Sequence, residues 1–299
     1  MTKGAASADA AAAWSRRRWL TAAGLAPLWA CEGAGRTSAS TTGTRVVSQT
    51  VLSDEVLWDL GPSVRSQVVA VSTMADDPRY SRVVGRWPAS IARAAGTSEA
   101  LLALAPDLVI LASFTAVETQ QLIRKAGLTA LVLERFDGFA DYRDNVRAIA
   151  TAVDAAAAAD EVIERFDARL SSLRVQDPAG PKILSWNEGS VPGASTSFHD
   201  IATAAGYRNL PAEHGRSGHL QLGVEQLVAW DPEVLVVPCG EDDCERVAAQ
   251  LADRPGLRST RAVREGHVVT IPSRDLYSTG AGMLDVVERL VSARPGIRP

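Results

Sequence analysis

The sequence has 299 residues, of which 46% are hydrophobic, 22% charged and 5% aromatic, and its formal net charge is −4. This length fits one large domain or two ordinary ones and supplies enough chain for a sizeable core. The hydrophobic content is too high for an intrinsically disordered chain. Three cysteines are too few for a disulfide-dense scaffold, and the negative charge does not favour a nucleic-acid-binding protein.

Residues 1–30 have the pattern of an export signal. Three consecutive arginines, Arg16 to Arg18, precede an apolar stretch over residues 19–30. That stretch is shorter than the roughly 20 residues of a membrane-spanning helix and has the length of the apolar part of a signal peptide. Paired arginines followed by an aromatic residue and leucine resemble a twin-arginine signal. The alternative is a disordered N-terminal extension.

The end of this stretch resembles the lipobox of bacterial lipoproteins. It reads Leu28-Trp29-Ala30-Cys31, with Trp29 where the lipobox usually has a small residue. The resemblance implies that Cys31 is lipidated and begins the mature chain. Residues 31–44 are rich in Gly, Ser and Thr and are predicted to be a flexible tether. We therefore expect a periplasmic or extracytoplasmic protein held at the membrane by its lipid alone.

Residues 45–138 alternate short apolar runs with helical segments. We predict strands at 46–47, 68–71, 108–111 and 130–133, and helices at 53–60, 99–104 and 118–126. Continuous apolar strands that alternate with helices indicate a parallel sheet covered on both faces. This segment is the predicted N-terminal α/β lobe.

Residues 139–177 have no strand pattern and are predicted to be helices that link two lobes. Helices are expected at 139–152 and 155–175. The second carries an apolar stripe that includes Val162 and Phe166. At 1.5 Å per residue it would be about 31 Å long.

The α/β pattern then restarts over residues 181–299. Strands are predicted at 182–186, 234–237 and 266–271, and helices at 197–205, 223–230, 244–252 and 281–293. The segments 98–110 and 223–235 share one local order, which is Glu, a short helix, proline beside an acidic residue, and a strand. The predicted fold is α/β, with two lobes built on parallel sheets, one long helix between them and a ligand cleft between the lobes.

Five stretches resemble, in order, the periplasmic substrate-binding proteins of ABC importers for ferric siderophores, haem and cobalamin. They are residues 45–61, 99–111, 198–209, 225–237 and 266–272, and the resemblance covers residues 45–293. It implies two α/β lobes joined by a rigid helix, a metal chelate captured between them, and delivery to a membrane permease and its ATPase. We expect a ferric siderophore as the ligand, with cobalamin or haem as the alternative. A sensor or interaction protein on the same fold is the alternative from another class.

An enzyme is not expected. The sequence lacks the G-x-S-x-G nucleophile elbow, the G-x-x-x-x-G-K-[ST] phosphate loop and the H-E-x-x-H metal motif. All four histidines follow the long helix, so a metal site shared between the lobes would lack histidine from the first. Glu213, His214 and His219 have the spacing of a loop metal site, but a solvated loop is the simpler interpretation. We predict no protein-held metal or cofactor, since a chelate brings its own metal.

Ligand contacts are expected on loops that follow strands. The predicted ligand-binding residues are Trp87, Trp186, Phe198 and Tyr277 as apolar walls, Arg274 as a partner for anionic groups, and Asp275 as a hydrogen-bond acceptor. Arg79, Arg82 and Arg86 offer further cations, which favours an anionic chelate. Tyr80, Tyr277 and His199 are candidate axial ligands if the chelate is haem. For each residue the alternative is an ordinary surface or core position.

The same resemblance implies that one acidic residue on each lobe docks on arginines of the permease. Glu118 occupies the matching place in the first lobe, and Asp242 with Asp243 in the second. Acidic residues at a helix start also occur simply as solvated groups that favour the helix dipole.

Cys239 and Cys244 are predicted to form a disulfide, because export permits one and Cys31 is used by the lipid. Free thiols and a metal or redox site remain the alternatives. We expect a monomer with no nucleic-acid partner.

Overall fold

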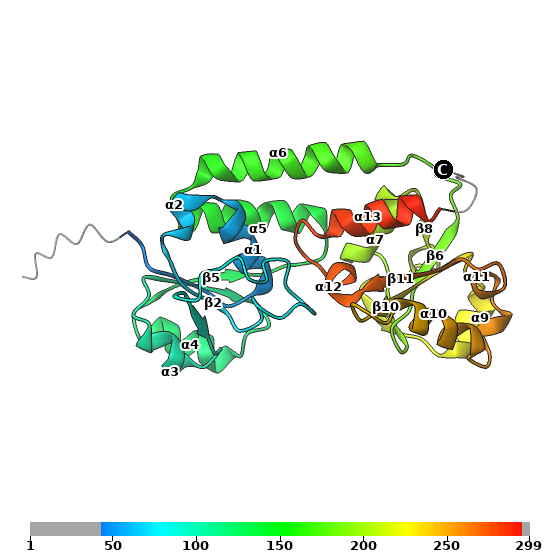
Figure 1. The fold of residues 1–299 in the computed structure, drawn as a ribbon, viewed down its shortest axis with the longest axis horizontal. Coiled ribbons are helices and arrows are strands. Elements are labelled where there is room, and N and C mark those ends of the chain that lie inside the picture. The colour runs from blue at the N-terminus through cyan, green and yellow to red at the C-terminus, as the bar shows by residue number, and fades with distance from the viewer. Residues whose placement is uncertain (1–42, 295–299) are drawn as a thin grey trace, which may run out of the picture. The chain divides into compact units, whose positions relative to one another are not determined.

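The computed structural model describes residues 43–294, which contain two parallel sheets (Figure 1). The first sheet has the order β3-β2-β1-β4-β5, and every neighbouring pair is parallel. Its strands are β1 (Val46–Ser48), β2 (Val68–Ser72), β3 (Ala92–Ala94), β4 (Leu108–Ala112) and β5 (Thr129–Leu133). The helices of this lobe are α1 (Val51–Asp59), α2 (Pro62–Arg65), α3 (Ser98–Ala103), α4 (Val117–Lys125) and α5 (Phe139–Ala152). The central strands β1 and β4 are fully buried, as helices on both faces require.

The second sheet has the order β11-β10-β6-β8 and is also parallel. Its strands are β6 (Lys182–Ser185), β8 (Arg208–Asn209), β10 (Val234–Cys239) and β11 (Val268–Pro272), and a separate antiparallel pair joins β7 (Ser190–Pro192) to β9 (His219–Gln221). The helices are α7 (Ser197–Ala204), α8 (Leu210–Glu213), α9 (Val224–Trp230), α10 (Cys244–Asp253), the 3-10 helix η1 (Leu257–Ser259), α11 (Arg261–Arg264), α12 (Ser273–Leu276) and α13 (Met283–Ser292).

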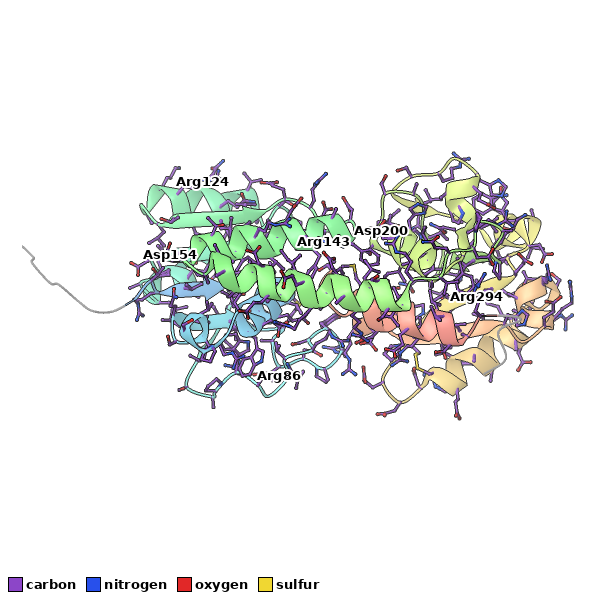
Figure 2. The ribbon with its side chains drawn as sticks, turned by 90° about the horizontal axis from the view of Figure 1, so that it is seen from above. Arg86, Arg124, Arg143, Asp154, Asp200 and Arg294 are labelled. Carbon is purple, nitrogen blue, oxygen red and sulfur yellow. A yellow bond between two sulfur atoms is a disulfide. The ribbon has the colours of Figure 1, made fainter. Side chains whose placement is uncertain are left out.

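The lobes are joined by α6 (Ala156–Leu173), which lies against α5 of the first lobe and α13 of the second (Figure 1). Its 18 residues give a length of about 27 Å. The predicted apolar stripe is buried, and one hydrophobic cluster runs from α5 through α6 to α13. Asp154, with a φ of 54°, makes the turn from α5 into α6, and Arg143 ties the two helices by donating to Asp167 at 2.8 Å (Figure 2).

Two local features differ from the sequence-based expectation. The first helix begins at Val51 rather than at residue 53, because Thr50 and Ser53 form a capping box in which each side chain accepts from the other's backbone N–H. Strand β3 has the sequence Ala-Arg-Ala, which lacks β-branched residues and was not expected to be a strand.

The α/β fold with two parallel-sheet lobes is confirmed. No helix within residues 43–294 combines the length and apolar character needed to cross a bilayer. The expected export signal and Cys31 lie outside the described residues, as does nearly all of the expected tether.

Candidate functional site

A cavity of about 250 Å³ lies where loops from both lobes meet. These loops follow β1, β2, β4, β5 and β11, so the cavity lies at the carboxyl ends of parallel strands, the usual place for ligands in α/β folds. The first lobe contributes Gln49, Thr50, Val51, Leu52, Glu55, Met74, Tyr80, Phe114 and Phe136, and the second contributes Ser273, Arg274, Tyr277, Ser278, Thr279 and Gly280.

The walls of this cavity are mainly apolar and aromatic. Met74, Tyr80 and Phe114 of the first lobe are 40%, 50% and 79% exposed, and Tyr277 of the second is 50% exposed. These four make up half of the large hydrophobic side chains that are exposed within residues 43–294. The rings of Phe114 and Phe136 lie 5.5 Å apart. Such a concentration of exposed apolar groups marks a surface that binds apolar faces of a ligand.

Two buried carboxyl groups lie at the start of α1 beside the cavity. Asp54 accepts hydrogen bonds from the Ser72 hydroxyl at 2.5 Å and the Ser72 amide at 3.1 Å, which fixes α1 against the end of β2. Glu55 accepts from the Arg82 amide at 3.1 Å. Burial raises the pKa of Asp54 to about 6 and that of Glu55 to about 7, although these hydrogen bonds oppose the change.

Arg82, on the loop after β2, pairs with two carboxylates of the other lobe. It donates to Asp275 at 2.6 Å and also pairs with Asp285. Arg289 forms an ion pair with Asp275 at 3.3 Å, and Arg169 of α6 forms an ion pair with Asp285 at 2.6 Å. The side chain of Asp275 is only 4% exposed, and these arginines are its partners in the interior.

The Arg82→Ala substitution is expected to lower the free energy of unfolding by about 2 kcal/mol, because it removes one partner of a buried carboxylate while Arg289 remains. Urea unfolding measures this. The matched control is Arg79→Ala, which breaks an exposed pair with Asp77 and should leave stability unchanged. Equal stability of the two variants would show that the Arg82 pairs do not stabilise the fold.

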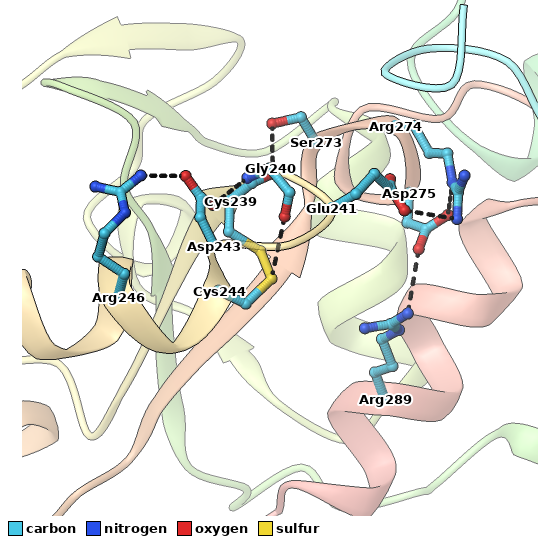
Figure 3. The surroundings of a disulfide bond; sticks show 10 residues. All are labelled: Cys239, Gly240, Glu241, Asp243, Cys244, Arg246, Ser273, Arg274, Asp275 and Arg289. Carbon is cyan, nitrogen blue, oxygen red and sulfur yellow. Dashed lines mark hydrogen bonds and ion pairs between the residues drawn. A yellow bond between two sulfur atoms is a disulfide. The ribbon is translucent and has the colours of Figure 1, made fainter.

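In the structure Cys239 and Cys244 form a disulfide, which closes the loop between β10 and α10 (Figure 3). The Ser273 hydroxyl donates to the Cys239 carbonyl at 3.2 Å, which ties this loop to the start of α12. Glu241 of the same loop pairs with Arg274 at 3.2 Å. Because Arg274 also lines the cavity, this ion pair connects the disulfide loop to the cavity wall.

Replacing both Cys239 and Cys244 with serine is expected to lower the free energy of unfolding by about 2 kcal/mol, the chain-entropy value for a loop of roughly six residues. Chemical unfolding with and without dithiothreitol measures this. Reductant should destabilise the unmodified protein and leave the double variant unaffected. A double variant as stable as the oxidised protein would contradict the prediction.

Of the residues predicted to contact ligand, Arg274 and Tyr277 line the cavity. Burial raises the pKa of Tyr277, and a hydrogen bond with the Asn187 side chain opposes this. The expectation that Asp275 offers a free acceptor is wrong, since it lies buried among Arg82, Arg274 and Arg289.

The structure corrects three predicted aromatic walls, because none of them lines the cavity. Trp87 is 3% exposed and packs edge-on against Trp58 at 5.2 Å, and Phe198 is 4% exposed in the main core. Trp186 is 3% exposed in the core of the second lobe and borders a different cavity beside α10. Burial in the core removes the apolar surface of each ring from water, which favours this position over the cavity surface.

The acidic residues predicted to dock on a permease lie at the surface. Glu118 is exposed in the first turn of α4, and Asp242 is exposed in the disulfide loop. Asp243 is half-buried, accepts from the Gly240 amide at 2.6 Å and pairs with Arg246. Glu118 and Asp242 are therefore the more accessible of the predicted docking residues.

Within residues 43–294, no group of three or more His, Cys, Asp or Glu side chains could hold a metal ion. The His214 ring stacks on Trp230 at 4.3 Å, and His219 is exposed on β9. His199 borders a separate cavity of about 550 Å³ on the second lobe, near Arg174 and Tyr207. It does not line the cavity between the lobes.

Sequence reasoning missed Glu55 and Phe136, which both line the cavity. Phe136 follows β5, so its position directly after a parallel strand was a usable signal. Glu55 lies on the inner side of α1, and an acidic residue within an otherwise buried stretch was the available signal.

Comparisons with known proteins agree with this geometry. The sequence model of the family described as Periplasmic binding protein matches residues 46–275. A protein of Halobacterium salinarum named cobalamin-binding protein is 27% identical over 260 residues, which cover 83% of this chain and 69% of the relative.

Two solved structures share the fold. One is a possible iron-binding periplasmic solute-binding protein from Staphylococcus epidermidis, with a TM-score of 0.72, 15% identity, and coverage of 84% of this chain and 98% of the other. The second is a periplasmic haem-binding protein from Roseiflexus, with a TM-score of 0.68, 23% identity, and coverage of 84% of this chain and 99% of the other. The chain therefore belongs to the periplasmic binding protein family, whose members bind ligands and are not enzymes.

Proposed function

We propose that this protein captures a metal chelate in the cavity between its lobes and delivers it to an ABC importer. The observation that carries the proposal is the set of exposed apolar side chains that both lobes direct to one cavity, Met74, Tyr80 and Phe114 from the first and Tyr277 from the second. A chelate with flat apolar faces gains binding energy from such walls, and each lobe contributes one side of the site.

The lining favours a tetrapyrrole-type macrocycle, a corrinoid first and haem second, over a ferric siderophore. Three of the four arginines that favoured an anionic ligand are already paired, Arg79 with Asp77, Arg82 with Asp275 and Arg274 with Glu241. The cobalamin-binding name of the halobacterial relatives supports the corrinoid. For haem, Tyr80 and Tyr277 are the candidate axial ligands at the cavity.

The remaining parts of the proposal concern location and partners. The protein works outside the cytoplasm as a monomer, anchored by a lipid on Cys31, and binds no nucleic acid. Its partners are a permease and the ATPase of that permease. Glu118 on one lobe and Asp242 with Asp243 on the other dock on cationic groups of the permease, because exposed carboxylates steer association with a cationic surface.

The ligand is tested by titrating the tryptophan fluorescence of the protein with cyanocobalamin, haemin, a ferric hydroxamate and a ferric catecholate. The proposal expects saturable one-to-one quenching, strongest with cyanocobalamin. Saturation by a siderophore alone would retain the transport role and reject the macrocycle. The absence of saturation with all four would reject chelate binding.

Docking is tested separately, by combining Glu118→Ala with Asp242→Ala. Ligand affinity should be unchanged, whereas uptake in cells that carry the importer should fall at least tenfold. Asp160→Ala combined with Glu164→Ala on α6 is the matched control, because it removes two exposed carboxylates elsewhere. Normal uptake by the double variant would reject these residues as the docking groups.

A further inference from the structure

Glu55 has an unusual position for a carboxyl group. It lines the cavity, yet the residue is only 9% exposed. One carboxyl oxygen, Oε1, accepts from the Arg82 amide at 3.1 Å. The other, Oε2, faces Gly280 of the second lobe, where a β-carbon would lie only 2.7 Å away. Glycine at position 280 therefore leaves the space that this carboxyl group occupies.

The charged groups around Glu55 do not neutralise it. The guanidinium of Arg82 is engaged by Asp275 and Asp285, so only the backbone of Arg82 is a direct partner. Asp54 and Asp59 on the same helix are acidic, and Tyr142 of α5 is a further titratable group nearby. From the second lobe, the neighbouring Ser278 and Gly280 carry no charge. Arg274 lines the same cavity and is charged, but it is paired with Glu241 at 3.2 Å.

A carboxylate has about four acceptor positions, and an acceptor without a donor is costly in an apolar site. The cavity around Glu55 is walled by Met74, Phe114 and Tyr277, which leave most of these positions unused. A ligand that brings hydrogen-bond donors to Glu55 is therefore favoured, and a ligand that brings only acceptors is disfavoured.

We propose that Glu55 is a specificity-determining residue that accepts hydrogen bonds from amide groups at the rim of the ligand. Corrinoids carry acetamide and propionamide side chains, whose NH₂ groups donate. Porphyrins such as haem carry propionate groups, which are acceptors and repel a carboxylate. The residue thus selects amidated corrinoids against haem. This inference rests on the proposed function, because it assigns the ligand class of the same cavity.

The test measures the dissociation constants of cyanocobalamin and haemin for the unmodified protein, Glu55→Gln and Asp59→Asn at pH 8. Glu55→Gln keeps the shape but loses the charge, and is expected to weaken cyanocobalamin binding about tenfold, as for one charge-assisted hydrogen bond. Haemin binding should be unchanged or tighter. Asp59→Asn makes the same charge change on the same helix, away from the cavity lining, and should change either constant less than twofold.

A second measurement needs no substitution. The affinity of the unmodified protein for cyanocobalamin should rise severalfold between pH 6 and pH 8, because Glu55, whose pKa burial raises to about 7, accepts best when ionised. Asp54 titrates in the same range but does not line the cavity, and a flat profile for Glu55→Gln assigns the effect to Glu55.

The outcomes separate the two claims. If cyanocobalamin binds but neither the substitution nor pH changes its affinity, the role of Glu55 is overturned and the proposed function stands. If no chelate binds the unmodified protein, the proposed function fails and the role of Glu55 fails with it.

Discussion

Tyr277→Ala is expected to weaken binding of the chelate about 30-fold while the protein remains folded. Tyr277 is the aromatic residue that the second lobe contributes to the cavity lining, together with apolar groups of the first lobe. Truncation of a central aromatic anchor costs about 2 kcal/mol of binding free energy, which corresponds to a factor of about 30. The side chain is 50% exposed in the free protein, so its loss creates no cavity in the core.

Isothermal titration with cyanocobalamin measures this effect, and Leu122→Ala is the matched control. Leu122 is 45% exposed on α4 and does not line the cavity, so its truncation removes similar apolar surface away from the site. The two variants should unfold at similar urea concentrations. Equal affinity of Tyr277→Ala and Leu122→Ala would show that the ligand does not contact the second-lobe wall.

The second large effect is a loss of stability as the pH rises from 5 to 8. Burial raises the pKa of Glu55 from 4.5 to about 7 and that of Asp54 from 3.8 to about 6. At a pH between the pKa of the unfolded chain and the pKa of the folded protein, the folded protein binds more protons than the unfolded chain. The free energy of unfolding therefore falls as the pH rises through the folded pKa. Each pKa shift lowers the free energy of unfolding by about 3 kcal/mol at a pH where the carboxyl group is ionised in both the folded and the unfolded state.

Urea unfolding at pH 5 and pH 8 tests this, with Glu55→Gln as the comparison. Glutamine does not titrate, so the variant should lose more than half of the stability difference between the two pH values, because part of the Asp54 effect already occurs below pH 5. It should be the more stable protein at pH 8. Carboxyl groups whose pKa is lowered by arginine, such as Asp177, titrate below this range. An unmodified protein equally stable at both pH values would contradict the burial of these two acids.

Most of the fold could be predicted because its elements carry strong local signals. Helix α5 was predicted with the observed bounds, since its apolar period is regular and its ends are marked. The strands β2, β4 and β5 are short apolar runs between helices, as a buried parallel sheet requires. Strand β3 carries no such signal, and only pairing with β2 makes it a strand.

The site was predictable at the level of loops but less so for single side chains. Loops after parallel strands converge by topology, which placed Arg274 and Tyr277 at the cavity. Trp87 and Phe198 lie in or beside such loops, yet their rings point into the core. An aromatic residue has the same sequence signature in a cavity wall and in a core, so the path of the loop decides between them. Glu55 was missed because an acid near a helix start usually faces solvent.

A crystal structure of the protein with cyanocobalamin would show where the chelate binds. We expect the macrocycle between Phe114 and Tyr277, with an amide group of the corrinoid within hydrogen-bonding distance of Glu55. A corrinoid found instead in the cavity beside Arg174 and Tyr207, with the space between the lobes unchanged, would contradict this expectation.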